Sequence, residues 1–533
     1  MVGIAEVRAP TARTAVLPDS SRRPSGIAAA VGAFGAVVAM AGSWNPSLWS
    51  DEVASLTSAQ RSFPSLFEML GHVDAVHGAY YVLLHFWVGT AGTSAFVLRL
   101  PSALAAGLAV AAVVLIVSKL STIRLAVLAG LVCSVLPRMT SIGEDARSYA
   151  LSAAVAAWLT YLLLVILERG FQPGGVAPQG PVQRRVAPRT LWILYGALMA
   201  AGILLFLYLA LVAAAHLIVI WRAHRGASVF SAWGTATGCA LLAAFPLAIL
   251  AIGERAQIRY LSATPQVSAR SLIVGLWFGD WPVAVISWVL IGIAIVAAIW
   301  SAGSSSRRMR VAGIAIPNRP SIEFIATSWL LVPSALMIGG QFLYPAFTAR
   351  YLSFCAPAAA ILIACGIGRI WRWRRPFGVL AIATFVGLVA PVYVAQRGPY
   401  AKNGADLAEI SAAMKAEASP GDAVVFDRSV PISKKPRLAL RAYPAGFAGL
   451  EDVTLKTPYY RNTSWLDVTY SIAQAAAIGR FDDVNNVWLI DYRSGDHRDR
   501  YGIADLQRLG YIERTIHVET PHSVIYEFSK HDQ

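Results

Sequence analysis

The sequence predicts a polytopic α-helical membrane protein with about eleven transmembrane helices, followed by a C-terminal α/β domain. Only 14% of its 533 residues are charged, the mean hydropathy is +0.55, and soluble proteins carry roughly 25% charged residues. Several apolar runs reach about 18 residues, enough to cross a bilayer as a helix. After Val394 the composition changes to short strand-like runs between polar turns. One large soluble core is excluded, because single cores stop growing near ~250–300 residues.

The apolar runs define the spans in order along the chain, after a polar segment 1–25 that we expect to be a disordered cytoplasmic N-terminus. The region 190–222 could instead form one long helix, but that change would place the later basic loops on the opposite side. The expected spans are 26–43, 99–118, 124–139, 148–167, 190–206, 208–222, 228–252, 283–300, 322–342, 351–368 and 376–395.

The formal charge of +15 gives the orientation. Much of the excess lies in short loops between apolar runs, where basic residues mark the cytoplasmic side, so nothing points to nucleic-acid binding. This predicts a multi-pass protein of the plasma (inner) membrane, with the first loop 44–98 and the C-terminal domain 396–533 extracytoplasmic. The basic segments expected inside are Arg22–Arg23, Lys119 and Arg124, 168–190, Arg222 and Arg225, 307–310 and 369–375.

One stretch of the first loop must lie along the membrane surface. Residues 44–76 and Arg99-Leu100-Pro101 are both expected outside, and the apolar stretch 79–88 between them is too short to span. We therefore expect an interfacial helix there, with its aromatic residues at the headgroup level. The stretch 271–281, broken by glycine and proline, is expected to behave likewise.

The C-terminal segment has the pattern of a small α/β domain. Residues 422–426 and 487–491 read as buried parallel strands, because their apolar runs are short and continuous. We expect helices at 406–418 and 503–509, and a terminal strand pair at 515–518 and 523–528.

Four polar clusters lie at the expected outside ends of the spans. Each alone could be a solvated loop end, but their shared side and complementary chemistry favour one site. Carboxylates suit a general base, and arginine with tyrosine suits a phosphate. The clusters are Trp49-Ser50-Asp51-Glu52, His77-Gly78-Ala79-Tyr80-Tyr81, Glu144-Asp145-Ala146-Arg147-Ser148-Tyr149 and Arg350-Tyr351.

Together with Leu98-Arg99-Leu100-Pro101-Ser102, these motifs resemble the GT-C glycosyltransferase superfamily. The nearest branch holds the protein O-mannosyltransferases and the bacterial lipid A aminoarabinose transferase. The resemblance covers roughly residues 26–370, and it rests on the order and spacing of the motifs. It departs from the family pattern after His77, where Gly78-Ala79 stands in place of the usual prolines.

The resemblance implies an inverting sugar transfer from a polyprenyl-phosphate donor. Asp51 matches the family's acidic residue and would be the general base, with Glu52 as a second catalytic carboxylate that binds the acceptor or orients Asp51. Glu52 could instead simply pair with an arginine, and Arg99 could be a helix-start anchor. Donor-phosphate binding falls to His77, Arg147, Arg350 and Tyr351, and acceptor binding or support falls to Tyr80, Tyr81, Glu144 and Asp145.

A divalent metal is an open question. Some relatives hold a metal ion at the acidic loop, so Asp51, Glu52 and Asp145 could bind Mg²⁺ or Mn²⁺, although no spacing demands it. No glycine-rich nucleotide loop is present, which fits a lipid-linked donor.

The C-terminal domain and the alanine-rich composition resemble actinobacterial cell-envelope glycosyltransferases. That resemblance favours mannose transfer to a lipoglycan or polysaccharide acceptor, with an arabinofuranosyltransferase as the alternative, and the C-terminal domain is a candidate acceptor-binding domain. A lipid or glycan transporter is the rival from another class. Transporters place ionisable groups at mid-membrane and show internal repeats, whereas here the carboxylates gather at one surface. A noncatalytic envelope-assembly protein is the third interpretation.

Overall fold

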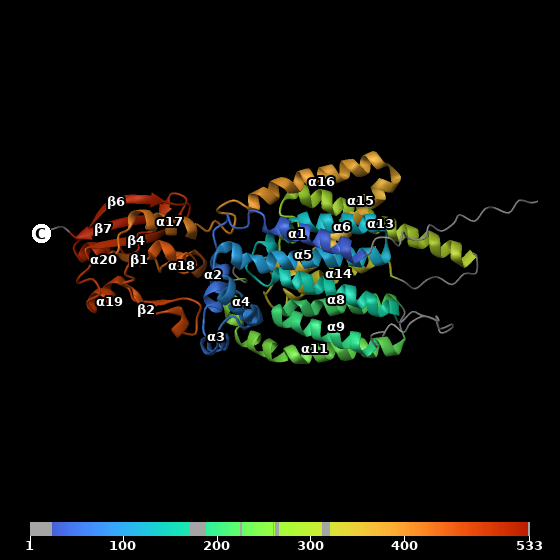
Figure 1. Cartoon of the computed structure of the whole chain (residues 1–533), viewed down its shortest axis with the longest axis horizontal. Coiled ribbons are helices and arrows are strands. Elements are labelled where there is room, and N and C mark those ends of the chain that lie inside the picture. Colours follow the sequence, from blue (N-terminus) through green and yellow to red (C-terminus); the bar gives the residue numbers. More distant parts are fainter. Residues whose placement is uncertain are drawn as a thin grey trace, which may run out of the picture.

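The computed structural model describes residues 24–169, 188–223, 226–258, 261, 266–311 and 320–530. The expected disordered N-terminus, the basic pair Arg22–Arg23, most of the loop 168–190 and Arg225 lie outside the described residues. The molecule is elongated, with a helical bundle at one end and the C-terminal domain at the other (Figure 1). Helices α2, α3 and α4 lie where the two meet.

The bundle contains a helix at each of the eleven expected spans. Among the described residues, seven helices are long and apolar enough to cross a membrane, and α6 with α7 forms an eighth, bent span. Three shorter apolar helices, α1, α9 and α10, complete the set. The predicted polytopic fold is confirmed. The helices are α1 Pro24–Met40, α5 Ala95–Leu120, α6 Ile123–Val135, α7 Pro137–Gly143, α8 Tyr149–Arg169, α9 Pro188–Leu205, α10 Leu211–Arg222, α11 Ala227–Gly253, α13 Trp281–Val311, α14 Ile322–Gly340, α15 Ala356–Trp373 and α16 Arg375–Gln396.

The bend between α6 and α7 has a local cause. Proline disfavours the helical conformation of the residue before it, and Leu136, which precedes Pro137, is extended at φ −60° and ψ 128°. The two helices meet at 59°. The segment 144–148 follows α7 and leads into α8.

The region 190–222 forms two helices, as expected, and not one. Phe206 is extended between α9 and the 3₁₀ turn η2, Leu207–Ala210, which leads into α10. Phe206 and Tyr208 line the same cavity as Glu254, which follows α11. Helices α10 and α11 therefore leave this end of the bundle and return to it. At the opposite end, Lys119 and Arg369 line one pocket, so these two basic loops share a face.

Close packing of α1 on α5 positions the first loop. A Cβ atom added at Gly32 would lie 2.8 Å from the carbonyl oxygen of Gly107, and one at Gly107 would lie 2.6 Å from the carbonyl oxygen of Gly32. Small residues let two membrane helices approach this closely. The contact holds the end of α1, and so the start of the first loop, against α5, which carries Arg99.

Three short helices and a turn build the layer between the bundle and the C-terminal domain. They are α2 Ser50–Ala59, α3 Phe63–Leu70, the 3₁₀ turn η1 Ala75–His77 and α4 Gly78–Ala91. With 14 residues, α4 is too short to span, as expected for the stretch 79–88. The stretch 271–281 begins with a single π-helical turn, η4, over Ser271–Gly275.

The C-terminal domain has the predicted α/β organisation. The main sheet has the order β1-β4-β7-β6, with the short β5 on β4. Strands β1 and β4 are parallel, with Ala423 beside Val487, and β7 pairs antiparallel with β4 and β6. The elements are β1 Ala423–Phe426, β2 Leu455–Thr457, β3 Val468–Thr469, β4 Asn486–Ser494, β5 His497–Arg498, β6 Tyr511–Glu519, β7 Ser523–Lys530, α17 Leu407–Glu417, α18 Leu438–Ala442, α19 Ile472–Ala477 and α20 Ile503–Arg508.

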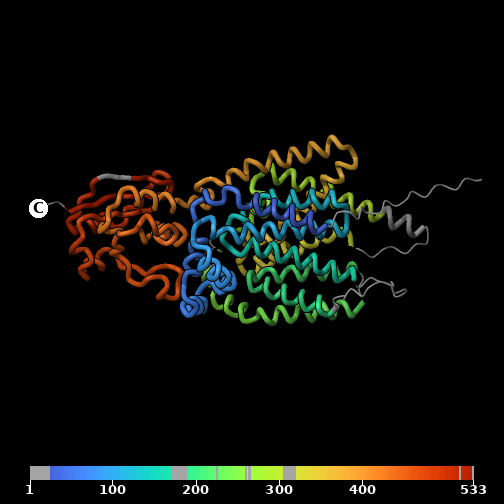
Figure 2. The backbone as a smooth tube through the Cα atoms, viewed as in Figure 1, coloured from blue at the N-terminus to red at the C-terminus, as the bar shows by residue number. Residues whose placement is uncertain are grey.

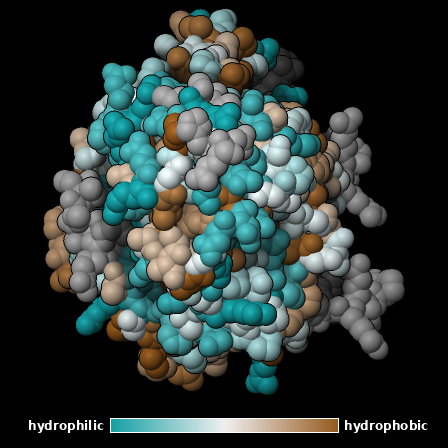
Figure 3. Space-filling model, turned by 90° about the vertical axis from the view of Figure 1, so that its left-hand side faces the viewer, coloured by the Kyte–Doolittle hydropathy of each residue, from teal (hydrophilic) through white to brown (hydrophobic). Residues whose placement is uncertain are grey.

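A buried arginine of the first loop binds the C-terminal domain. The Arg61 side chain is fully buried and donates to the carbonyl oxygens of Tyr459, Asn462 and Ser464. The Leu48 amide donates to the Tyr443 hydroxyl at 2.8 Å. These bonds fix the domain against the loop that carries Asp51. The end face that the C-terminal domain presents is largely hydrophilic (Figure 3). The backbone trace in Figure 2 shows this domain at one end of the molecule and the helical bundle at the other.

Candidate active site

Asp51 lies in the first turn of α2, where the helix dipole favours a carboxylate. Its Oδ2 atom is 2.8 Å from Nη1 of Arg350 and 4.0 Å from Nη2 of Arg147. The Asp51 side chain is 24% exposed, so it stays open to a ligand. Arg350 belongs to the 3₁₀ segment η5, Ala349–Cys355, which precedes α15. Three distant parts of the sequence thus meet at one carboxylate.

Arg147 is the centre of a hydrogen-bond network. It lies between α7 and α8, and its Nη2 atom is 2.9 Å from Nε2 of His77. Burial, with the charges of Arg147 and Arg350, holds the pKa of His77 well below its usual value. The imidazole is therefore neutral near pH 7 and accepts the hydrogen bond from Arg147. Arg147 also donates to the Tyr81 hydroxyl at 3.4 Å.

Asp74 is a member of this network that the sequence analysis missed. The Tyr81 hydroxyl donates to Oδ2 of Asp74 at 2.9 Å. Asp74 has a left-handed backbone, with φ 58°, an uncommon conformation for a residue with a side chain. Burial raises its pKa. Glu254, also missed, accepts from the Ala75 amide at 2.9 Å and ties η1 to the end of α11. No sequence motif marks either residue.

Glu52 turns away from the site. Its carboxylate forms two hydrogen bonds with Arg99, at 2.6 and 2.7 Å, and both side chains are 0% exposed. Glu52 also accepts from the Ala146 amide at 2.9 Å, next to Arg147. Arg99 uses its remaining donors on carbonyl oxygens of the loop after α1, including that of Pro46 at 2.8 Å. The pair therefore ties the first loop to α5 and to the Arg147 loop.

The other expected support residues are buried around the site. Oδ1 of Asp145 accepts from the Trp49 indole at 3.0 Å, and the Trp49 ring lies under Arg350, 5.5 Å from its guanidinium carbon. Glu144 is 1% exposed and pairs with Arg397 and Lys402, which follow α16 in the chain. The Tyr80 side chain is buried in the packing of α4.

A cavity of about 410 Å³ lies beside His77 and Tyr351. His77 and Tyr351 connect it to the network around Arg147, and the rest of its wall is largely apolar and comes from η2, α11 and the loop after α14. Tyr351 stacks on Tyr208, with ring centroids 5.3 Å apart. The lining residues are Val76, His77, Phe206, Leu207, Tyr208, Ala248, Ala251, Ile252, Glu254, Arg255, Gln257, Tyr344, Ala346 and Tyr351.

The three carboxylates considered for a metal do not converge. Asp51 contacts Arg350, Glu52 is used by Arg99, and Asp145 accepts from Trp49. Within the described ranges, no group of three or more His, Cys, Asp or Glu side chains is arranged to hold a metal ion. In this structure the three carboxylates therefore do not form a shared set of metal ligands.

The fold is shared with solved structures. No family model matches the chain, and no curated protein matches it in sequence. ArnT from Cupriavidus metallidurans, bound to undecaprenyl phosphate, superposes with a TM-score of 0.56 at 13% identity, covering 94% of this chain and 98% of ArnT. The apo structure of the same protein gives 0.54 at 11% identity, with the same coverage.

The chain has the ArnT fold. The expected polytopic helical architecture is therefore confirmed, including a C-terminal domain after the last span. An apo oligosaccharyltransferase from Archaeoglobus fulgidus is also similar, with a TM-score of 0.47 at 12% identity, and it covers 86% of this chain and 69% of its own. The match to ArnT runs nearly end to end in both chains.

Proposed function

We propose that the chain is an inverting membrane glycosyltransferase that moves a sugar from a polyprenyl-phosphate donor to a cell-envelope acceptor. One observation carries the proposal: a partly exposed carboxylate, Asp51, faces Arg147 and Arg350, and their neighbours His77 and Tyr351 line a largely apolar cavity. A lipid-linked sugar phosphate needs these parts together. The ArnT structure with undecaprenyl phosphate shows that a protein of this fold binds such a lipid.

In this mechanism the donor phosphate lies against Arg350 and Arg147, and the lipid follows the apolar wall of the cavity. His77 supports Arg147, and Tyr351 lines the wall beside the phosphate. Arginine binds phosphate oxygens with two parallel hydrogen bonds, which fixes the orientation of the leaving group. The guanidinium groups also stabilise the charge that develops on that phosphate.

Asp51 acts as the general base. The acceptor hydroxyl attacks the anomeric carbon while its proton moves to Asp51. The bond from that carbon to the phosphate oxygen breaks, and its electron pair leaves with the lipid phosphate. Direct displacement inverts the anomeric centre. When the phosphate engages Arg350, it competes with Asp51 for the guanidinium and so releases the carboxylate for the acceptor.

The sugar and acceptor belong to the same proposal. We favour mannose as the sugar and a lipoglycan or polysaccharide as the acceptor, at the extracytoplasmic face of the plasma membrane. The resemblance of the C-terminal domain and of the composition to actinobacterial envelope transferases supports this choice. Glu52, Tyr80 and Glu144 act by support, because each is buried against protein partners.

The test is sugar transfer by the purified protein. Polyprenyl-phosphate mannose and polyprenyl-phosphate arabinose, each radiolabelled, are offered with envelope acceptors, and the Asp51→Asn variant is compared with the native protein. Loss of a general base predicts a drop of about 10²–10⁴-fold in the variant. The Arg372→Ala variant, altered at the opposite end of the bundle, is the control. Normal transfer by Asp51→Asn would show that Asp51 is not the base.

A further inference from the structure

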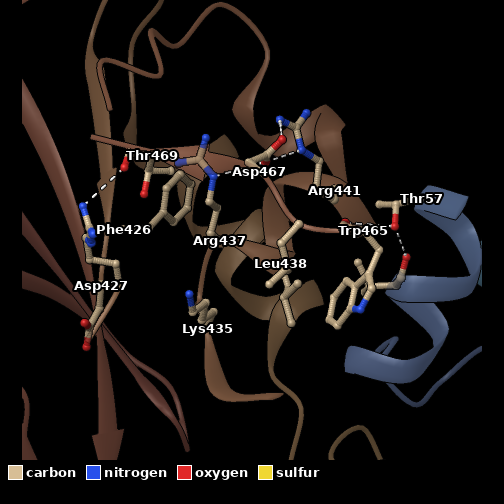
Figure 4. Close-up of a pocket in the computed structure, with 13 residues that line it drawn as sticks. Thr57, Phe426, Asp427, Lys435, Arg437, Leu438, Arg441, Trp465, Asp467 and Thr469 are labelled. Carbon is tan, nitrogen blue, oxygen red and sulfur yellow. Dashed lines mark hydrogen bonds and ion pairs between the residues drawn. The ribbon is translucent and has the colours of Figure 1, made fainter. Parts of the chain in front are cut away.

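A second polar groove lies between the C-terminal domain and α2 (Figure 4). It begins at Phe426, the last residue of β1, and its opposite wall is Val53 and Thr57 of α2. In α/β sheets, ligands bind beyond the carboxyl ends of parallel strands. The lining residues are Val53, Thr57, Phe426, Asp427, Arg428, Lys435, Arg437, Leu438, Arg441, Trp465, Leu466, Asp467 and Thr469.

Two of the four basic residues in the groove are neutralised by protein carboxylates. Arg441 donates to both oxygens of Asp467, at 2.7 and 2.8 Å. Arg437 donates to Asp452 at 3.1 Å and to Asp467 at 3.2 Å. Asp427 is 1% exposed and accepts from the backbone amide and hydroxyl of Ser429. Arg437 and Arg441 are therefore neutralised, whereas Asp427 forms no ion pair within 4.0 Å among the described residues.

The other two basic residues carry the charge that remains. Among the described residues, neither Arg428 nor Lys435 forms an ion pair within 4.0 Å, and Arg428 donates to the carbonyl oxygen of Thr469 at 3.3 Å. Burial and the charge of Arg428 lower the pKa of Lys435. An anion that entered the groove would offset this repulsion. The carboxylate of Asp427 opposes this effect on Lys435. The four cations of the groove still outnumber the three carboxylates Asp427, Asp452 and Asp467, so the remaining positive charge favours an anion.

The size of the groove limits that group. Its free volume is about 30 Å³, which holds roughly two water-sized groups. A carboxylate fits, and so do the outer oxygens of a phosphate, whereas a sugar ring has to stay outside. Trp465 lies at the α2 side of the groove, where its carbonyl oxygen accepts from the Thr57 hydroxyl at 3.3 Å (Figure 4). An indole beside an anion pocket is a suitable surface for a sugar ring.

The groove is separate from the reacting centre, although both use α2. Val53 and Thr57 follow Asp51 by two and six residues, so helical geometry places them about 160° and about 120° around the axis from it. The helix thus stands between the groove and Asp51. A group bound in the groove is therefore too far from Asp51 to be the reacting hydroxyl. It would belong to a more distant part of the acceptor molecule.

We propose that this groove binds the carboxylate or phosphate of an anionic saccharide segment of the acceptor, at a distance from the sugar that receives the transfer. This inference rests on the proposed transferase function only in identifying the bound saccharide as the acceptor. Lys435 and Arg428 bind the anion, and Trp465 faces the attached ring. The acceptor class is thereby narrowed to an acidic or phosphorylated envelope glycan.

The test is direct binding to the full-length protein in neutral detergent, measured by calorimetry at low salt. Three probes separate the chemistries: tetragalacturonate carries carboxylates, phosphopentamannose carries a phosphate, and maltotetraose is uncharged. We expect at least one of the two anionic probes to bind and maltotetraose not to bind. Lys435→Gln weakens that binding about tenfold, the loss of one charge-assisted hydrogen bond. The matched control is Lys415→Gln, on the exposed side of α17.

The outcomes separate this inference from the proposed function. Binding of one anionic probe, with weakening in Lys435→Gln alone, supports the groove and identifies its group as carboxylate or phosphate. No anionic binding, equal binding of maltotetraose, or equal affinities of Lys435→Gln and Lys415→Gln would overturn it. The Asp51→Asn variant should bind the probe normally. If the protein binds the probe but transfers no sugar, the inference about the groove stands and the proposed transferase function is wrong.

Discussion

Arg350 reaches Asp51 across 299 positions of the chain, with Nη1 and Oδ2 2.8 Å apart. The contact joins the first turn of α2 to the segment before α15, so it records how the first loop sits on the bundle. It also means that the proposed base and the proposed donor phosphate compete for one guanidinium group. Donor binding and activation of the base are then coupled in a single exchange of partners.

Replacing Arg350 should impair donor use. Arg350→Ala removes a cation beside the leaving phosphate, and the loss of one such group costs about 100-fold in rate. Arg350→Lys keeps the charge but loses the two-pronged geometry, so we expect an intermediate loss. The measurement is the initial rate against donor concentration, with the exposed Arg372→Ala as the control. An unchanged kcat/KM for the donor in Arg350→Ala would remove Arg350 from the site.

Glu52→Gln should lower the stability of the folded protein. The substitution leaves Arg99 charged and buried without its partner, which typically costs about 3–5 kcal/mol. We expect a lower Tm in detergent and a lower yield of folded protein. The double variant Glu52→Gln/Arg99→Met should regain part of the loss, since neither charge then remains. A Glu52→Gln protein with native Tm and no activity would instead assign Glu52 a direct catalytic role.

His77 should not titrate in the working range. Its pKa is held well below the usual value by burial and by the charges of Arg147 and Arg350, so the ring is already neutral at the pH where an ordinary histidine titrates. His77→Gln retains a hydrogen-bond acceptor for Arg147, and its pH–rate profile should have the native shape. The profile of kcat/KM tests this. An inflection near the ordinary value of about 6.5, present in the native protein and absent in His77→Gln, would contradict it.

Asp491 should make the C-terminal domain less stable toward unfolding as the pH rises. It is 0% exposed on β4, and burial, with the carboxylates of Asp427 and Asp499, raises its pKa to about 9 from the usual 3.8. Between these values the folded chain holds a proton that the unfolded chain has lost, so stability falls with increasing pH. Asp491→Asn removes this loss, and we expect a gain of about 1–3 kcal/mol at pH 8.

Amide hydrogen exchange of β4 measures that gain. Exchange at pH 8 should be slower in Asp491→Asn than in the native protein, and the difference should shrink toward pH 4, where both side chains are neutral. Asp496→Asn, in the exposed turn between β4 and β5, is the matched control and should have no effect. A difference of the same size at both pH values would rule out titration of Asp491 as its cause.

The linear pattern of the chain determined the architecture. Apolar run length decided which segments become membrane helices, because the bilayer sets the length that a helix must reach. Basic loops grouped the helix ends, and Lys119 and Arg369 do meet in one pocket. The short apolar runs at 422–426 and 487–491 likewise identified the two parallel strands, which the structure places at 423–426 and 486–494. These are local properties of the sequence, so they can be recognised without knowledge of any distant contact.

Only the tertiary structure decided which side chains meet. Asp51 and Glu52 are adjacent, yet a helix turns about 100° between them, so Asp51 faces Arg350 and Arg147 while Glu52 is buried against Arg99. Asp74 joins the network through a left-handed turn and a bond to Tyr81, and no motif marks it. Partner choice depends on helix rotation and packing across hundreds of residues, and a linear pattern carries neither.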